Sequence, residues 1–388
     1  MFFFIVIFVL FTLLFFVSYF WTHYGILILL APTKPWIMEM LKYRTLGENI
    51  RHQVTIFFIV AIILLTLIQI YFLNSKFLYK FNIKKLLFIS LFTSVVASLS
   101  YTFLSSDIFN YLFAGKMLTF FHLNPYINAP VVLRGKELWL AFVVNTENIY
   151  HNVFGTQIKY AYGPVFLAYS LIPFLIFSSD RFLGVFYGFK LLNVLTFMVC
   201  GLMLLKINNN DKKVFAYWFF NPFLLLELLV NSHNDLVMIT LFVTSMYFAT
   251  VNKNRIFQIT AFVASVATKF VNAPLMFVLA TKGQTRELLF KLAGLGILFY
   301  HALDPKQVWY YSWVYMIIPF VKIKNRSLAI LFILQCLLLI TQYSGFMLSN
   351  QWELLYWMPS QLYLRWSLPI LLILSEIKII AFLKKPKS

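Results

Sequence analysis

The chain has 388 residues, of which 61% are hydrophobic and only 12% are charged, and these proportions exclude an ordinary soluble domain. Its net charge of +19 comes from Lys and Arg residues that sit in short segments between apolar runs. That placement is typical of the cytoplasmic loops of a membrane protein and of contacts with anionic membrane lipids, and it argues against nucleic acid as a partner.

Apolar runs of about 20 residues recur along the chain, so we predict an all-α, polytopic transmembrane protein with about 11 to 13 helices. No stretch is long and polar enough to form a separate soluble domain, and residues 1–388 are expected to form one membrane domain. The first apolar run has no basic segment before it and no cleavage site, which predicts a retained helix. Cys200 and Cys336 lie in apolar runs and predict no disulfide or metal framework.

Three parts follow from placing the basic clusters on the cytoplasmic side: N-terminal spans in 1–85, a long extracytoplasmic loop in 105–181 and a remaining bundle in 182–388. The span 86–104 follows a basic segment, so Asp107 is expected outside. The apolar segment 160–177 cannot cross fully without inverting everything after it, and it predicts an interfacial or re-entrant helix.

The later spans are expected to alternate in direction and to leave His233, Asn234 and Asp235 on the outer side. The segment 256–278 contains Lys269 and Pro274, which predicts a broken helical hairpin. The loop 31–53 is expected outside in spite of its basic residues. The other predicted spans are 182–205, 214–230, 236–251, 288–300, 309–320, 327–345 and 362–383.

Polar side chains gather directly after the span 86–104, where they are costly unless they serve a function. Asp107 is a helix cap, a surface carboxylate or a general base at the mouth of a membrane cavity. A second group lies at 227–235, where Glu227 and Asn231 are four residues apart and are expected to share a helix face. An Asn or Asp before an apolar run is also an ordinary helix start. No second histidine has ligand spacing to His233, so we predict no metal and no cofactor.

Lys269 lies inside an apolar run, where a lysine needs an anion, and a lipid phosphate is the anion most available there. A solvated helix face is the alternative. Arg365 is either a second phosphate-binding group or a side chain that snorkels to the interface. Tyr311, Trp313 and Tyr315 form an interfacial aromatic belt or stack on a sugar, and we favour the belt.

Several short motifs follow one another along the chain. They are Asp107-x-x-x-Tyr111, Gly115-Lys116, Asn124-Pro125-Tyr126, Tyr162-Gly163-Pro164, Asn221-Pro222 with Glu227 and His233-Asn234-Asp235, and Thr268-Lys269. Their order resembles the GT-C superfamily of membrane glycosyltransferases, and within it the polyprenyl-phosphate-mannose-dependent mannosyltransferases of prokaryotes. The matching stretches cover 107–126, 162–164, 221–235 and 268–269. This chain has Lys116 where relatives often carry arginine, and Tyr162-Gly163-Pro164 where many have Tyr-Pro-Pro.

The resemblance implies that Asp107 is the catalytic carboxylate, that His233 and Asp235 face the same cavity and that Lys269 binds the phosphate of the lipid donor. It implies transfer of a hexose, with mannose expected from the resemblance alone, from a polyprenyl-phosphate donor to a glycan, glycolipid or protein acceptor. The transfer would invert the anomeric centre and occur at the outer face of the plasma membrane. The expected substrate-binding residues are Tyr111, Lys116, Asn124, Tyr126, Tyr162, Glu227, His233, Asn234, Asp235, Lys269 and Arg365.

A lipid or polyprenyl-phosphate-sugar transporter, or flippase, is the competing function, because it too needs polar groups within a membrane. Transporters often show repeated halves with paired broken helices near the midplane. No internal repeat is visible in this sequence, and its polar residues gather on one side of the predicted membrane. A purely structural membrane subunit would not need that outward cluster of acids. The sequence therefore favours the enzyme.

Overall fold

A computed structural model of the chain describes residues 2–20, 48–102, 104–105, 107–134, 136–137, 159–179, 181–303, 307–349 and 359–376. The described residues form helices and no β-strand, which confirms the all-α prediction. Among them, four helices are long and apolar enough to cross a membrane. These four are Phe2–Tyr19, His52–Asn74, Phe182–Ile207 and Asn325–Gly345, and a bent pair of helices would add a fifth.

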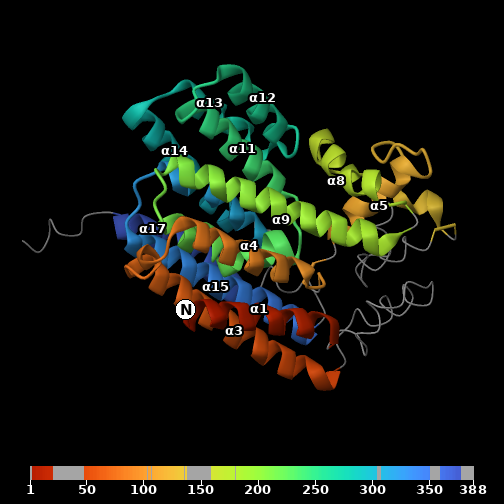
Figure 1. Ribbon diagram of the computed structural model, residues 1–388, viewed down its shortest axis with the longest axis horizontal. Helices are drawn as coiled ribbons and strands as arrows, with labels where there is room; N and C mark the ends of the chain where they lie inside the picture. Colours follow the sequence, from red (N-terminus) through yellow and green to blue (C-terminus); the bar gives the residue numbers. More distant parts are fainter. Residues whose placement is uncertain are drawn as a thin grey trace, which may run out of the picture.

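The N-terminal helix α1 (Phe2–Phe20) packs against both α3 (Glu48–Asn74) and α4 (Ile83–Leu99), and α15 (Asn325–Ser349) lies along α3 (Figure 1). Helix α4 starts where the Asn82 side chain accepts a hydrogen bond from the Lys85 amide, an ordinary N-cap. It ends at Leu99, earlier than the predicted span 86–104, and Ser100 directly after it is extended.

Helices α5 (Asp107–Thr119) and α8 (Pro164–Ile176) lie together beside the N-terminal end of α9 (Phe182–Ile207) (Figure 1). Helix α8 has 13 residues and is therefore about 20 Å long, too short for a bilayer core of about 30 Å. Its length agrees with the prediction that the segment 160–177 makes no full crossing. Pro164 occupies the first turn, where its missing amide hydrogen costs nothing.

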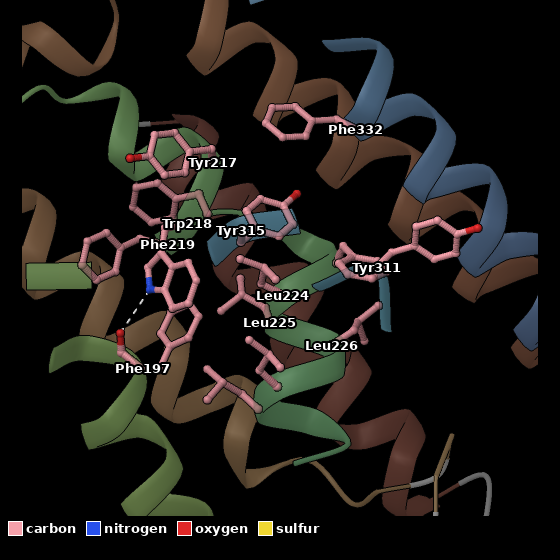
Figure 2. Close-up of a cluster of buried hydrophobic side chains, with 14 of the residues drawn as sticks. Phe197, Tyr217, Trp218, Phe219, Leu224, Leu225, Leu226, Tyr311, Tyr315 and Phe332 are labelled. Carbon is pink, nitrogen blue, oxygen red and sulfur yellow. Dashed lines mark hydrogen bonds between the residues drawn. The ribbon is translucent and has the colours of Figure 1, made fainter. Parts of the chain in front are cut away.

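Residues 214–230 lie at the centre of the core. Their side chains are nearly all apolar and are all buried, and such a segment is stable only when other helices surround it. In Figure 2 its Trp218 donates a 3.1 Å hydrogen bond to the carbonyl of Phe197, and the two rings stack. The predicted single crossing 214–230 is broken, because Pro222 lacks an amide hydrogen and the Asn221 side chain caps the next turn. The pieces are η4 (Phe215–Phe219), α10 (Pro222–Leu224) and η5 (Leu225–Val230), of which η4 and η5 are π-helical.

After η5 the chain bends by 114° and continues as α11 (Asp235–Thr250), which packs on α12 (Arg255–Val266). The residues after α12 are extended at Lys269, so the predicted break in the segment 256–278 is present. The chain then continues through η6 (Phe270–Leu275), α13 (Met276–Ala280) and α14 (Gly283–Leu303).

The predicted crossing 309–320 is instead a narrow 3₁₀-type segment, made of η7 (Val308–Met316) and η8 (Ile318–Phe320) and packed against α11, α14 and α15. The aromatic belt expected at Tyr311, Trp313 and Tyr315 is wrong, because all three side chains are buried inside the protein. Helix α17 (Pro359–Glu376) packs on α14 and α15. Two short turns, η2 (Leu78–Lys80) and η3 (Pro130–Leu133), complete the described elements.

Some predictions concern segments outside the described residues. These segments are most of the loop 31–53, the part of the long loop at 138–158, and residues 377–383 at the end of the last predicted span.

Candidate active site

The start of α5 meets the bend between η5 and α11, and His233 lies at the meeting point. Its Nδ1 is 3.3 Å from Oδ2 of Asp107, and its Nε2 is 3.3 Å from Oε2 of Glu227. The imidazole ring stacks on Trp309 with the ring centres 4.1 Å apart and the planes within 18°. The imidazole is therefore held between two carboxylates by its edges and against an indole by its face.

The backbone at the bend explains how His233 reaches this position. Ser232 adopts a left-handed conformation with φ of 61°, which is uncommon outside glycine and turns the chain sharply. The Ser232 hydroxyl donates to the Leu229 carbonyl at 3.0 Å, and the His233 amide donates to the Glu227 carbonyl at 3.1 Å. The bend is thus stabilised by the last turn of η5.

Glu227 is fully buried, but hydrogen-bond donors of neighbouring residues contact its carboxylate. The Tyr343 hydroxyl contacts both carboxylate oxygens, at 2.8 and 3.0 Å, and Asn231 Nδ2 donates to Oε2 at 3.0 Å. The contact between Asn231 and Glu227 confirms that the two residues share a face. Because a buried carboxylate is stable only when it is paired or hydrogen-bonded, this network keeps Glu227 beside His233.

Lys269 forms a second charged centre with Asp235. The Lys269 Nζ lies 2.8 Å from Oδ1 of Asp235, and Trp313 Nε1 donates to the same oxygen. The ammonium group also lies 4.3 Å from the ring centre of Tyr310 and 5.0 Å from that of Trp313. Asp235 is fully buried, whereas 18% of the Lys269 side chain is exposed, so Lys269 is not a freely solvated lysine.

Asp107 differs from the other two acids of the site in its exposure. A quarter of its side chain is accessible, whereas Glu227 and Asp235 are completely buried. Its Oδ2 accepts a weak hydrogen bond from the Tyr111 hydroxyl at 3.4 Å. Asp107 is thus the one of the three carboxylates that a substrate can reach without displacing protein atoms.

The segment Tyr162-Gly163-Pro164 is attached directly to the chain just before Lys269. The Gly163 amide donates to the Thr268 carbonyl at 3.2 Å, and a Cβ added at Gly163 would lie only 1.9 Å from the Ala267 carbonyl oxygen. Only glycine permits this approach. The ring of Tyr162 then contacts that of Tyr111, with centres 5.0 Å apart, which connects this segment to α5.

A family model described as alpha-(1→6)-mannopyranosyltransferase, N-terminal domain, matches residues 26–282. The chain belongs to this family. The matched range includes Asp107, Glu227, His233 and Lys269, and the membership agrees with the resemblance to GT-C mannosyltransferases. The protein is therefore a membrane mannosyltransferase, whose reaction needs a sugar donor and an acceptor. No curated protein and no solved structure matches the chain.

In this mannosyltransferase two further predicted substrate-binding cations, Lys116 and Arg365, are buried inside the protein. Lys116 forms a buried ion pair with Glu137 at 3.0 Å, about 13 Å further along α5 from Asp107. Arg365 is completely buried on α17, with its guanidinium 5.9 Å from the ring centre of Tyr311. The expectation that Arg365 snorkels to the interface is wrong, because the surrounding helices enclose it.

The remaining predicted residues lie near the site. The Tyr126 amide donates to Asn124 Oδ1 at 2.9 Å, and the Tyr126 hydroxyl donates to the Tyr162 carbonyl at 3.0 Å, so these residues support Tyr162. Asn234 precedes α11 and makes no side-chain capping bond. Its position between His233 and Asp235 keeps it at the bend.

Sequence reasoning missed three contributors: Trp309, Tyr343 and Lys190. Lys190 is completely buried in α9, and its ammonium donates to the carbonyls of Ser100 at 2.7 Å, Val230 at 2.8 Å and Leu229 at 3.4 Å. It therefore joins the segment that leads to Asp107 with the turn that leads to His233. Its signal in the sequence was a lysine in the middle of an apolar run. Trp309 and Tyr343 carried no comparable signal.

Proposed function

We propose that this protein transfers a mannosyl group from a polyprenyl-phosphate-linked donor to a hydroxyl of a glycan, glycolipid or protein acceptor. The reaction takes place at the extracytoplasmic face of the plasma membrane and inverts the anomeric centre. Asp107 is the general base. Family membership supports the mannosyl transfer, and the donor, the stereochemistry and the base are our proposal.

The observation that carries the proposal is the accessibility of Asp107 beside a buried polar chain. Behind its carboxylate lie His233 at 3.3 Å, then Glu227 at a further 3.3 Å, then the Tyr343 hydroxyl. A general base must be reachable by the substrate and held in one orientation by its surroundings, and Asp107 meets both requirements.

In the proposed step the acceptor oxygen attacks the anomeric carbon while Asp107 takes the proton from that oxygen. A new carbon–oxygen bond forms, and the bond from the anomeric carbon to the phosphate oxygen breaks. The phosphate ester leaves with the electron pair, and because it is a weak base it needs no protein acid. Direct displacement on one face of the sugar inverts the configuration.

Lys269 supports the departure of the phosphate in this proposal. The ammonium group of Lys269 has three N–H donors, and Asp235 accepts a hydrogen bond from one of them. A lysine about 4 Å from a phosphate interacts with it by a gross ~4 kcal/mol at an effective dielectric constant near 20. The Asp235 carboxylate and the two aromatic rings hold the ammonium in place before the substrate arrives.

The experiment that tests the proposal compares wild type with Asp107→Asn in membranes supplied with radiolabelled polyprenyl-phosphate-mannose. Loss of a general base lowers the rate by about 100- to 10,000-fold, so label should enter product only with wild type. Asp211→Asn is the matched control, because Asp211 contacts Tyr79 in a loop outside the site. Near-normal turnover of Asp107→Asn would refute the role of Asp107 as the general base. A product that keeps the anomeric configuration of the donor would refute inversion.

The sidedness of the site is tested by cysteine labelling, which is clean because Cys200 and Cys336 are both buried. A membrane-impermeant maleimide should label Ile127→Cys, an exposed position near Tyr126, in intact cells. It should label Asn210→Cys, in the loop after α9, only after permeabilisation. The reverse pattern contradicts an extracytoplasmic site, and labelling of Ile127→Cys that changes sides during turnover favours a transporter.

A further inference from the structure

A pocket of about 260 Å³ lies along one face of α5. Asn110, Ala114 and Met117 form its helical wall, and their spacing of four and three residues places them on one stripe. Asp107 is three residues before Asn110 and so lies at the N-terminal end of the same stripe. Asp107 does not itself line the pocket, and the lining residue Asn110 lies about one helical turn from it.

The opposite wall of the pocket is formed by residues 159–162 and is rich in tyrosine. The ring centre of Tyr160 lies 5.3 Å from that of Tyr162 and 5.5 Å from that of Tyr126. The Tyr160 amide donates to the Pro125 carbonyl at 2.9 Å, which fixes this wall to the loop after α5. The tyrosine wall is therefore held in place from two sides.

The hydroxyl of Tyr160 is buried and makes no hydrogen bond of ordinary geometry to a described residue, although the Ser170 hydroxyl lies near it. The side chain of Asn110 is half-buried and makes no hydrogen bond to the residues that the structure describes. A buried polar atom without a partner is costly, so a ligand that bonds to it gains free energy that the empty pocket lacks. Aromatic walls with a few convergent polar groups are typical of small-molecule sites, and they suit a sugar ring with its apolar faces and hydroxyl rim.

We infer that this pocket binds the sugar ring of the acceptor and directs one of its hydroxyls to Asp107. The inference rests on the proposed role of Asp107 as the base. Lys269, the cation proposed for the donor phosphate, is not among the lining residues, whereas the exposed Lys159 is. We assign the phosphate to Lys269 because Asp235 and two aromatic rings hold its ammonium in place, so donor phosphate and acceptor ring occupy different parts of the site. Asn110 and Tyr160 hydrogen-bond the acceptor ring, and the tyrosine wall contacts its apolar face.

The test uses the purified full-length protein and two alkyl mannosides as probes, one with a free 6-hydroxyl and one that is 6-deoxy. The 6-deoxy probe measures binding alone by titration calorimetry, and the 6-hydroxy probe measures transfer. Asn110→Ala and Tyr160→Phe should each weaken binding of the 6-deoxy probe about tenfold, the typical effect of one lost hydrogen bond. The KM for the 6-hydroxy probe should rise by the same factor, while the affinity for the lipid donor stays within about twofold.

Asn74→Ala is the matched control, because Asn74 is an exposed amide at the end of α3 and should leave both affinities unchanged. The inference is overturned if wild type does not bind the 6-deoxy probe, or if both pocket variants bind it as wild type does. Weakened donor binding with an unchanged KM for the 6-hydroxy probe would assign the pocket to the donor sugar instead. If the variants lose probe binding but Asp107→Asn still transfers mannose, the pocket assignment stands and the base assignment fails.

Discussion

The Nδ1 atom of His233 lies 3.3 Å from Oδ2 of Asp107, and this contact joins the start of α5 to the bend after η5. The two residues are far apart in the sequence, and they belong to different structural elements. On the far side of the imidazole, Glu227 lies at the same distance and is held by Tyr343 and Asn231. The most accessible acid of the site is therefore oriented by completely buried groups.

Replacing His233 tests whether this orientation matters. His233→Ala removes the imidazole between Asp107 and Glu227 and leaves a gap between the two carboxylates. Since a small misplacement of a reacting group can cost about 100-fold, we expect kcat to fall roughly 10- to 100-fold with little change in donor affinity. Steady-state kinetics at saturating donor measure the effect. The exposed residue His52 provides the control His52→Ala, and an unchanged kcat in His233→Ala would show that the contact is incidental.

Lys269 and Asp235 provide a test that separates folding from function. Lys269→Met leaves the buried Asp235 carboxylate without its cation, and removal of one partner of a buried pair costs about 3 to 5 kcal/mol. We expect a lower melting temperature and loss of donor binding. The double variant Lys269→Met/Asp235→Asn should regain most of the stability, because no uncompensated charge remains, yet it should still not bind donor. Recovery of donor binding in the double variant would contradict a role for Lys269 at the phosphate.

Gly163 is predicted to tolerate no side chain. In Gly163→Ala the new Cβ would lie 1.9 Å from the Ala267 carbonyl oxygen, so the backbone must move and displace Tyr162 and Lys269 together. Turnover should fall at least tenfold even where the protein remains folded, as judged by gel filtration in detergent. Gly296→Ala is the matched control, since no atom lies within 4 Å of the added Cβ. Equal activity of the two variants would mean that the approach of the two segments is not needed.

Lys190 is expected to matter for stability as well as for activity. Lys190→Met removes the donor from three buried carbonyls, and an unsatisfied buried acceptor costs about 1 to 3 kcal/mol. The melting temperature should fall, and turnover should fall with it because the segments carrying Asp107 and His233 lose their common anchor. Lys206→Met, at the exposed end of the same helix, should change neither quantity. A wild-type melting temperature and turnover in Lys190→Met would show that Lys190 does not anchor these segments.

The sequence by itself determined the features that depend on local periodicity and composition. Runs of apolar residues about as long as a bilayer is thick can only form buried or lipid-facing helices, so the all-α membrane class was predictable. The four-residue spacing of Glu227 and Asn231 places them on one helix face whatever surrounds them, and the structure confirms their contact. Lys269 beside Pro274 likewise predicted a broken helix.

Only the tertiary structure decided which distant groups meet. Trp309 and Tyr343 come from elements far along the chain, and no local pattern marks them as partners of His233 and Glu227. The same limit explains why Tyr311, expected at the lipid interface, lies buried against Arg365 instead. The sequence does not distinguish an aromatic or basic side chain near a helix end that faces lipid from one that faces protein. Its surroundings are set by how the helices pack, and packing depends on contacts between residues that the sequence does not bring together.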